Sequence, residues 1–129
     1  MYLTWRLPLV FVLTVLLFAC YSGPDDINND TTAAEIVQRA QEASDRNRYK
    51  LAMEYYRLIL ERFPGDIDMV CTAEYEIAFI HYKQRNYETA RAGFKALLER
   101  YNTPDEALLP PQYKRLASIV LERMGEKGK

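Results

Sequence analysis

Three side chains of this sequence are of types that carry reactive chemistry: Cys20, Cys71 and the single histidine, His81. A pair of thiols could form a disulfide, and a thiol beside an imidazole could act as a nucleophile. Cys71 and His81 both lie in an apolar pattern of helical spacing, so we expect a buried, inert thiol and an imidazole at a helix-packing position. No glycine-rich phosphate loop accompanies them. We therefore expect no enzyme, and no metal or cofactor site.

Cys20 stands at the end of an uncharged apolar run that begins at Leu7 and follows the basic Arg6. A helix of about 13 residues, rising about 1.5 Å per residue, falls well short of a bilayer core of about 30 Å. The run therefore fits the apolar region of a secretory signal better than a membrane-spanning helix. We predict a signal peptide at residues 1–19.

The four residues "LFAC" that end this run resemble the lipobox of bacterial lipoproteins. The resemblance implies that the Cys20 thiol carries a diacylglycerol, that the signal is cleaved before it, and that the new amino group carries an N-acyl chain. The chain would then be lipid-anchored in a bacterial cell envelope. In some bacteria an aspartate directly after the lipidated cysteine keeps a lipoprotein in the inner membrane. Because Tyr21 stands at that position, the outer membrane, with the domain facing the periplasm, is favoured. The alternative is an ordinary signal peptide followed by a chance cysteine.

Behind the signal, composition divides the chain into three parts. Residues 20–31 are rich in Asp, Asn, Ser, Gly and Pro and are predicted to be a flexible tether. Thr32 and Glu35 form a capping-box pattern that opens a folded domain at residues 32–125, followed by a tail at 126–129. The net charge is −1, with Lys and Glu interleaved, so no basic stripe for nucleic acid is present.

Within the domain, apolar residues recur at helical spacing and polar or Pro-Gly clusters interrupt them. No strand-like alternation is long enough to predict a sheet. We expect an all-α fold with helices at residues 33–43, 49–63, 68–83, 87–101 and 112–124, and a short helix after Thr103.

Two of these segments are copies of each other: "YKLAMEYYRLILERFP" at 49–64 and "YETARAGFKALLERYN" at 87–102. Aligned at an offset of 38 residues, they share a small alanine between aromatic residues, which lets two helices approach closely. A helix pair that repeats in this way is typical of an α-solenoid. The positions expected to pack the repeats are Tyr49, Ala52, Tyr56, Pro64, Tyr87, Ala90 and Phe94.

These residues resemble the tetratricopeptide repeat, and the resemblance covers about residues 33–124. It implies two helix pairs, with helix 111–124 as a cap, and places Ile77, Ala78 and His81 against the partner helix. The long connection after "ERFP" is common in a branch that contains the BamD-type lipoproteins of outer-membrane β-barrel assembly and the YbgF/CpoB-type envelope proteins. The resemblance therefore implies a scaffold for envelope proteins, most specifically a BamD-like subunit that binds a β-barrel assembly protein; the alternative is a YbgF/CpoB-like adaptor for peptidoglycan or cell-division machinery.

In tetratricopeptide proteins the first helix of each pair lines a groove, which places Tyr75, Phe79 and Tyr82 on the inner side. Their spacing forms one stripe of a helix, and aromatic side chains are good anchors for a protein partner. The expected groove residues are Tyr75, Phe79, Tyr82, Lys83, Lys114 and Ser118. The alternative is that the last helix covers this stripe as core. No nucleic acid and no small-molecule substrate is expected.

Overall fold

The computed structural model describes residue 24 and residues 26–126, and this part of the chain contains five α-helices, one 3-10 helix and no strand. The all-α prediction is thereby confirmed. The predicted signal peptide, Cys20 and the tail beyond residue 126 lie outside the described residues. The elements are α2 (Ala33–Asp45), α3 (Tyr49–Arg62), α4 (Ile67–Lys83), α5 (Tyr87–Arg100), η1 (Pro104–Leu108) and α6 (Pro111–Glu126).

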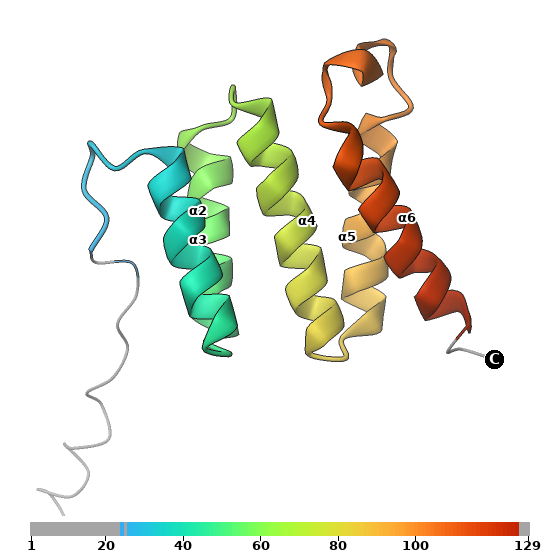
Figure 1. The fold of residues 1–129 in the computed structure, drawn as a ribbon, viewed down its shortest axis with the longest axis horizontal. Helices are drawn as coiled ribbons and strands as arrows, with labels where there is room; N and C mark the ends of the chain where they lie inside the picture. Colours follow the sequence, from blue (N-terminus) through green and yellow to red (C-terminus); the bar gives the residue numbers. More distant parts are fainter. Residues whose placement is uncertain (1–23, 25, 127–129) are drawn as a thin grey trace, which may run out of the picture.

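The helices form two layers, with α2, α4 and α6 in front of α3 and α5 (Figure 1). Each helix packs against the next one along the chain, and α4 also contacts both α2 and α6. This packing of helix pairs is compatible with a helical repeat solenoid. The front layer is the one that carries the aromatic stripe of α4.

The first helix begins at the capping box that the sequence predicts. The Thr32 hydroxyl accepts a hydrogen bond from the Glu35 amide at 3.3 Å, and the Glu35 carboxylate accepts one from the Thr32 amide at 2.8 Å. These bonds satisfy two backbone donors that the start of a helix otherwise leaves without partners, and the bond from the Thr32 amide to the Glu35 carboxylate lowers the pKa of Glu35. Asp66 caps α4 in a similar way, because its carboxylate accepts from the Met69 amide at 3.2 Å.

The turns that end α2 and α4 have the same geometry. Asn47 and Arg85, 38 residues apart, have φ angles of 58° and 63°, in the left-handed region. The next amide in each turn donates to a carbonyl five residues earlier, Arg48 to Ala43 at 2.8 Å and Asn86 to His81 at 2.9 Å. This is the Schellman arrangement that ends many helices. The 38-residue offset therefore relates backbone conformation as well as sequence.

The same offset relates buried positions in the two hydrophobic clusters. Ala52 and Ala90 are both 0 % exposed, as are Tyr56 and Phe94. The first cluster fills the space between α2, α3 and α4, and the second fills the space between α4, α5 and α6. Pro64 and Tyr87 are exposed and contribute little to this packing, whereas Tyr49 packs against the first cluster.

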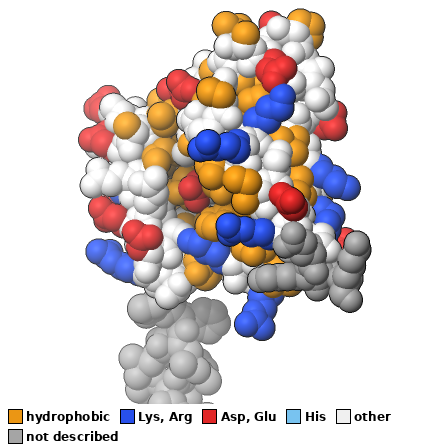
Figure 2. All heavy atoms as spheres, turned by 45° about the vertical axis from the view of Figure 1, so that its right-hand side comes forward, with side chains coloured by type: hydrophobic (Ala, Val, Ile, Leu, Met, Phe, Trp, Pro, Cys, Tyr) orange, Lys and Arg blue, Asp and Glu red, His pale blue; other side chains and the backbone are white. Residues whose placement is uncertain are grey.

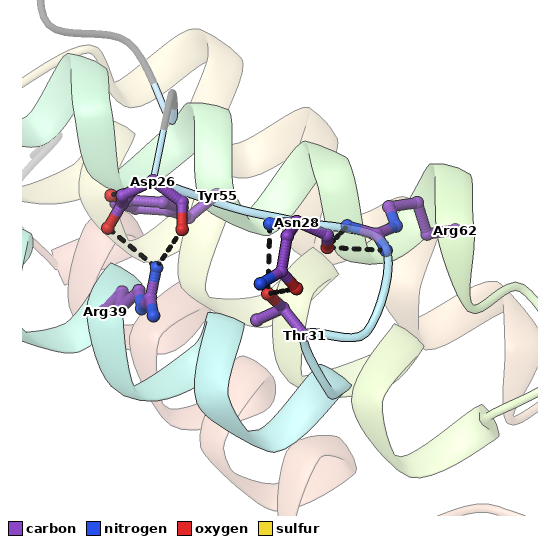
Figure 3. A network of polar contacts seen from close by, with 6 residues as sticks. All are labelled: Asp26, Asn28, Thr31, Arg39, Tyr55 and Arg62. Carbon is purple, nitrogen blue, oxygen red and sulfur yellow. Dashed lines mark hydrogen bonds and ion pairs between the residues drawn. The ribbon is translucent and has the colours of Figure 1, made fainter.

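One sequence prediction is wrong in part: residues 26–31 do not form a free tether. Ile27 packs against the first hydrophobic cluster, Thr31 is buried, and Asp26 bonds to side chains of α2 and α3 (Figure 3). Composition misled the prediction because polar residues with few apolar neighbours can still be ordered when a folded surface supplies hydrogen-bond partners.

Candidate functional site

The middle and end of α4 carry a continuous stack of aromatic rings. The ring centroids of Tyr75 and Phe79 are 5.7 Å apart with an interplanar angle of 15°, and those of Phe79 and Tyr82 are 5.8 Å apart at 20°. Residues spaced by four and three positions lie on one side of a helix, which explains the stack. The three rings therefore form one continuous row along α4.

Tyr75, however, belongs to the core. It is only 7 % exposed, and its ring lies 5.5 Å from the rings of both Phe94 in α5 and Tyr113 in α6. The alternative that the last helix covers the stripe is thus correct for Tyr75. Phe79 and Tyr82 remain half-buried, so these two rings are the part of the stripe that offers surface.

Tyr113 is a residue that the sequence reasoning missed. Its hydroxyl lies 2.7 Å from the Thr72 hydroxyl, so it links the start of α6 to the first half of α4. Tyr113 follows Tyr75 by 38 residues, the same offset that relates the two similar segments. Extending that offset beyond residue 102 would have identified it.

Lys83 closes the stripe at the end of α4. Its Nζ atom lies 5.3 Å from the centroid of the Phe79 ring and 5.8 Å from that of Tyr49, and it donates to the Ser44 hydroxyl at 3.4 Å. A cation above an aromatic ring is attracted by the negative face of the ring. Lys83 therefore joins the two front helices α2 and α4 at the end of the aromatic surface.

Glu76 is a second residue that the sequence reasoning missed. It is half-buried one helical turn before Ile80, and burial raises its pKa above the ordinary value, with Asp45 adding to the rise and Lys83 opposing it. Burial, with Glu76 as the next cause, raises the pKa of the Tyr75 hydroxyl to about 12. A carboxylate in partly apolar surroundings beside a lysine gives this surface a polar group that a partner could pair with.

Lys114 and Ser118 are exposed on α6, and they bond to residues of η1 and of α6 itself. The Lys114 ammonium is paired with the Glu106 carboxylate of η1 at 2.5 Å, and the Ser118 hydroxyl donates to the Lys114 carbonyl at 2.8 Å. Neither residue makes a contact to the aromatic stripe that would confirm the prediction that it lines the groove, so this part of the groove stays a prediction. Tyr113 is the α6 residue that meets the stripe.

The face on which α6 comes forward has apolar side chains near its middle, with several Lys and Arg side chains around them (Figure 2). Half-buried apolar residues of α4 and α6, including Phe79, Tyr82, Tyr113, Leu116 and Leu121, pack on the second hydrophobic cluster. Large apolar side chains that stay half-exposed together are a feature of protein-binding surfaces.

Cys71 and His81 are the described residues of the three reactive types, and they lie ten residues apart on α4, about 15 Å along the helix axis. Cys71 is 0 % exposed and burial raises its thiol pKa, as expected for an inert cysteine. His81 and Ile77 line an open hollow of about 350 Å³ between α3, α4 and α5, where Ala78 contacts Gly93. Within residues 24 and 26–126, no three His, Cys, Asp or Glu side chains come together in a group that could hold a metal ion.

An uncharacterized protein of Treponema pallidum (strain Nichols) is 36% identical over 110 residues, which are 84% of this chain and 44% of that protein. The chain thus spans less than half the length of this relative. No protein-family model matches the chain, and no solved structure matches it. Within the described residues, none of the helices has both the length and the apolar character needed to cross a membrane.

Proposed function

We propose that this protein is a lipid-anchored scaffold of the bacterial envelope, which binds other envelope proteins through tetratricopeptide-like repeats. The specific role that we propose is that of a BamD-like accessory subunit in the assembly of outer-membrane β-barrel proteins. The observation that carries the proposal is the half-buried pair Phe79 and Tyr82, bordered by Lys83 and Glu76.

Such a surface suits a protein partner better than a small substrate. Aromatic rings offer a large contact area and lose little rotamer entropy when bound. The stack with Tyr75 fixes the Phe79 ring before any partner arrives, which reduces the entropy lost on binding. Lys83 and Glu76 place one charge of each sign beside the rings, which would orient a bound segment.

The anchor rests on the "LFAC" pattern. Two or three acyl chains, each methylene worth about 0.8 kcal/mol when buried, would hold the domain durably on a membrane. We propose that this membrane is the outer membrane and that the domain faces the periplasm. The reason is that Tyr21 replaces the aspartate that some bacteria read, at this position, as a signal to keep a lipoprotein in the inner membrane.

The test is a pull-down from detergent-solubilised envelopes, with crosslinking and mass spectrometry of the retained proteins. The double variant Phe79→Ala/Tyr82→Ala removes the two half-buried rings while leaving Tyr75 in the core. Leu108→Ala is the matched control, because Leu108 is a large apolar side chain that is 74% exposed on η1, away from α4.

A β-barrel protein with periplasmic domains, retained by the wild type and the control but lost with the double variant, would support the proposal. Retention of peptidoglycan or cell-division proteins in its place would favour the YbgF/CpoB-like adaptor. Equal retention by all three proteins would mean that Phe79 and Tyr82 are not the binding surface.

A further inference from the structure

The chain that leads into α2 is held against the first helix pair at Asp26. The Arg39 guanidinium donates to the Asp26 carboxylate at 2.7 Å and to the Asp26 carbonyl at 2.8 Å. The Tyr55 hydroxyl donates to the other carboxylate oxygen at 2.8 Å. Both oxygens of one exposed carboxylate are therefore bound, one by a residue of α2 and one by a residue of α3 (Figure 3).

A second attachment follows two residues later. The Arg62 guanidinium donates to the carbonyl of Asn28 at 3.1 Å and to that of Asn29 at 2.9 Å. These acceptors are backbone atoms, so Arg62 fixes the path of the chain and not only a side chain. In Figure 3 the segment runs across α2 and α3 between the two arginines.

The segment also closes on itself. The Asn28 side chain accepts from the Thr31 hydroxyl at 2.9 Å and from the Asp30 amide at 3.0 Å. Ile27 packs on the first hydrophobic cluster, and Thr31 is 7 % exposed. Single exposed ion pairs contribute little, but several bonds to one short segment, together with a packed apolar side chain, can offset the entropy of ordering it.

We infer that this clamp, defined by Arg39, Tyr55 and Arg62 on residues 26–31, holds the repeat domain close to the membrane surface. The inference rests on the proposed lipid anchor at Cys20. Six residues of any conformation, from Cys20 to Asp26, span at most about 20 Å, whereas twelve residues to Thr32 would span at most about 40 Å. The clamp thus halves the maximum length of free chain between the anchor and the folded domain.

This reach restricts the partners that the domain can bind. Because Asp26 stays within about 20 Å of the anchor, the folded domain meets segments of envelope proteins that lie next to the bilayer rather than segments deep in the periplasm. The partner class is therefore the membrane-proximal part of a protein embedded in the same membrane. A free tether would raise the reach and lower the effective concentration at such a site.

The experiment uses the full, lipidated protein reconstituted in phospholipid vesicles, with a fluorescent donor on Arg46→Cys and acceptor-labelled lipid headgroups. Arg46 is exposed, whereas the native Cys71 is buried and unavailable to the dye. Hydrogen exchange of peptides that cover residues 26–31 is measured in parallel. The test variant is Arg39→Ala/Arg62→Ala, and Arg57→Ala, an exposed arginine of α3 outside the clamp, is the control.

We expect the test variant to exchange at residues 26–31 about tenfold faster, while α2 and α3 stay protected, and the donor to move away from the membrane by up to about 20 Å. Fast exchange in the wild type, or an unchanged donor position in the test variant, would overturn the inference. If the wild type showed slow hydrogen exchange at residues 26–31 but did not bind the vesicles, the clamp would stand and the lipid anchor would be refuted. The proposed position at the membrane would then be refuted as well.

Discussion

Gly93 of α5 lies so close to Ala78 of α4 that a Cβ atom at Gly93 would be 2.9 Å from the Ala78 Cβ. Two carbon atoms do not pack at that distance, and the Ala78 methyl group has no rotamer into which it could move. Ala78 is only 2 % exposed, although the contact borders the open hollow between α3, α4 and α5. The close approach of α4 and α5 therefore requires a residue without a side chain at position 93.

Gly93→Ala should lower the free energy of unfolding. Alanine favours a helix over glycine by about 1 kcal/mol, but overpacking at a contact this close costs about 1–3 kcal/mol, so we expect a net loss of up to about 2 kcal/mol. Urea denaturation followed by circular dichroism measures it. Gly125→Ala is the control, because nothing lies within 4 Å of a Cβ at that helical position, and it should not destabilise. A stabilised Gly93→Ala would mean that α4 and α5 can separate without cost.

Much of the fold could be predicted from the sequence because its signals are local or periodic. The capping residue Thr32, the Pro64-Gly65 break and the helical spacing of apolar residues each act within a few positions of the chain. The repeat could be predicted because Ala52 and Ala90 meet the same packing need twice. A packing requirement that recurs at a fixed spacing places similar residues at that spacing, and such a period can be recognised in the sequence.

The contacts that the sequence did not reveal join single residues far apart in the chain. Asp26 and Tyr55 are 29 positions apart, and Thr72 and Tyr113 are 41 apart. A hydrogen bond between two such side chains produces no periodic pattern in the sequence. The sequence therefore assigns Asp26 to the tether, and nothing in it distinguishes Thr72 from other helix residues. For the same reason, the sequence could not decide whether Tyr75 was surface or core.

Cys20→Ser should abolish the lipid anchor, because a hydroxyl does not replace the thiol that receives the diacylglycerol. We expect the protein to appear in the soluble fraction or to keep its signal peptide. Metabolic labelling with a radioactive fatty acid, followed by fractionation, measures both results. Serine at Cys71, a buried thiol, is the matched control and should keep the label. Lipid labelling that persists in Cys20→Ser would end the lipobox interpretation.

Arg85→Gly should stabilise the protein. Arg85 has a φ of 63°, a conformation that costs an L-residue about 1–2 kcal/mol, whereas glycine adopts it freely but loses more entropy on folding. The expected gain is about 0.5–1 kcal/mol by urea denaturation. Asn47→Gly is the comparison at the equivalent turn. It should gain less, because asparagine tolerates this conformation and its side chain accepts a hydrogen bond from the Tyr49 hydroxyl at 2.8 Å. A loss of stability in Arg85→Gly would show that the arginine side chain contributes more than its backbone strain costs.

Glu76 should make stability depend on pH, and the sign follows from its environment. Burial raises the pKa of Glu76 above its ordinary 4.5, with Asp45 acting in the same direction and Lys83 against it. Between the ordinary pKa and the raised one, the native state binds more protons than the unfolded state. The free energy of unfolding therefore falls as the pH rises through this window. Glutamine at this position cannot ionise, so that dependence should disappear.

We expect Glu76→Gln to be more stable than the wild type at pH 7 and to lose this advantage as the pH falls to 4.5 and below. Urea denaturation of both proteins from pH 4 to pH 8 measures the difference. Glu122→Gln, which alters an exposed carboxylate of α6, is the control and should leave the pH profile of stability parallel to that of the wild type. If Glu76→Gln were instead less stable at pH 7, the attraction between Glu76 and Lys83 would exceed the cost of burying the carboxylate. The polar group beside Phe79 would then stabilise the domain, and it would not be a charge left available for a partner.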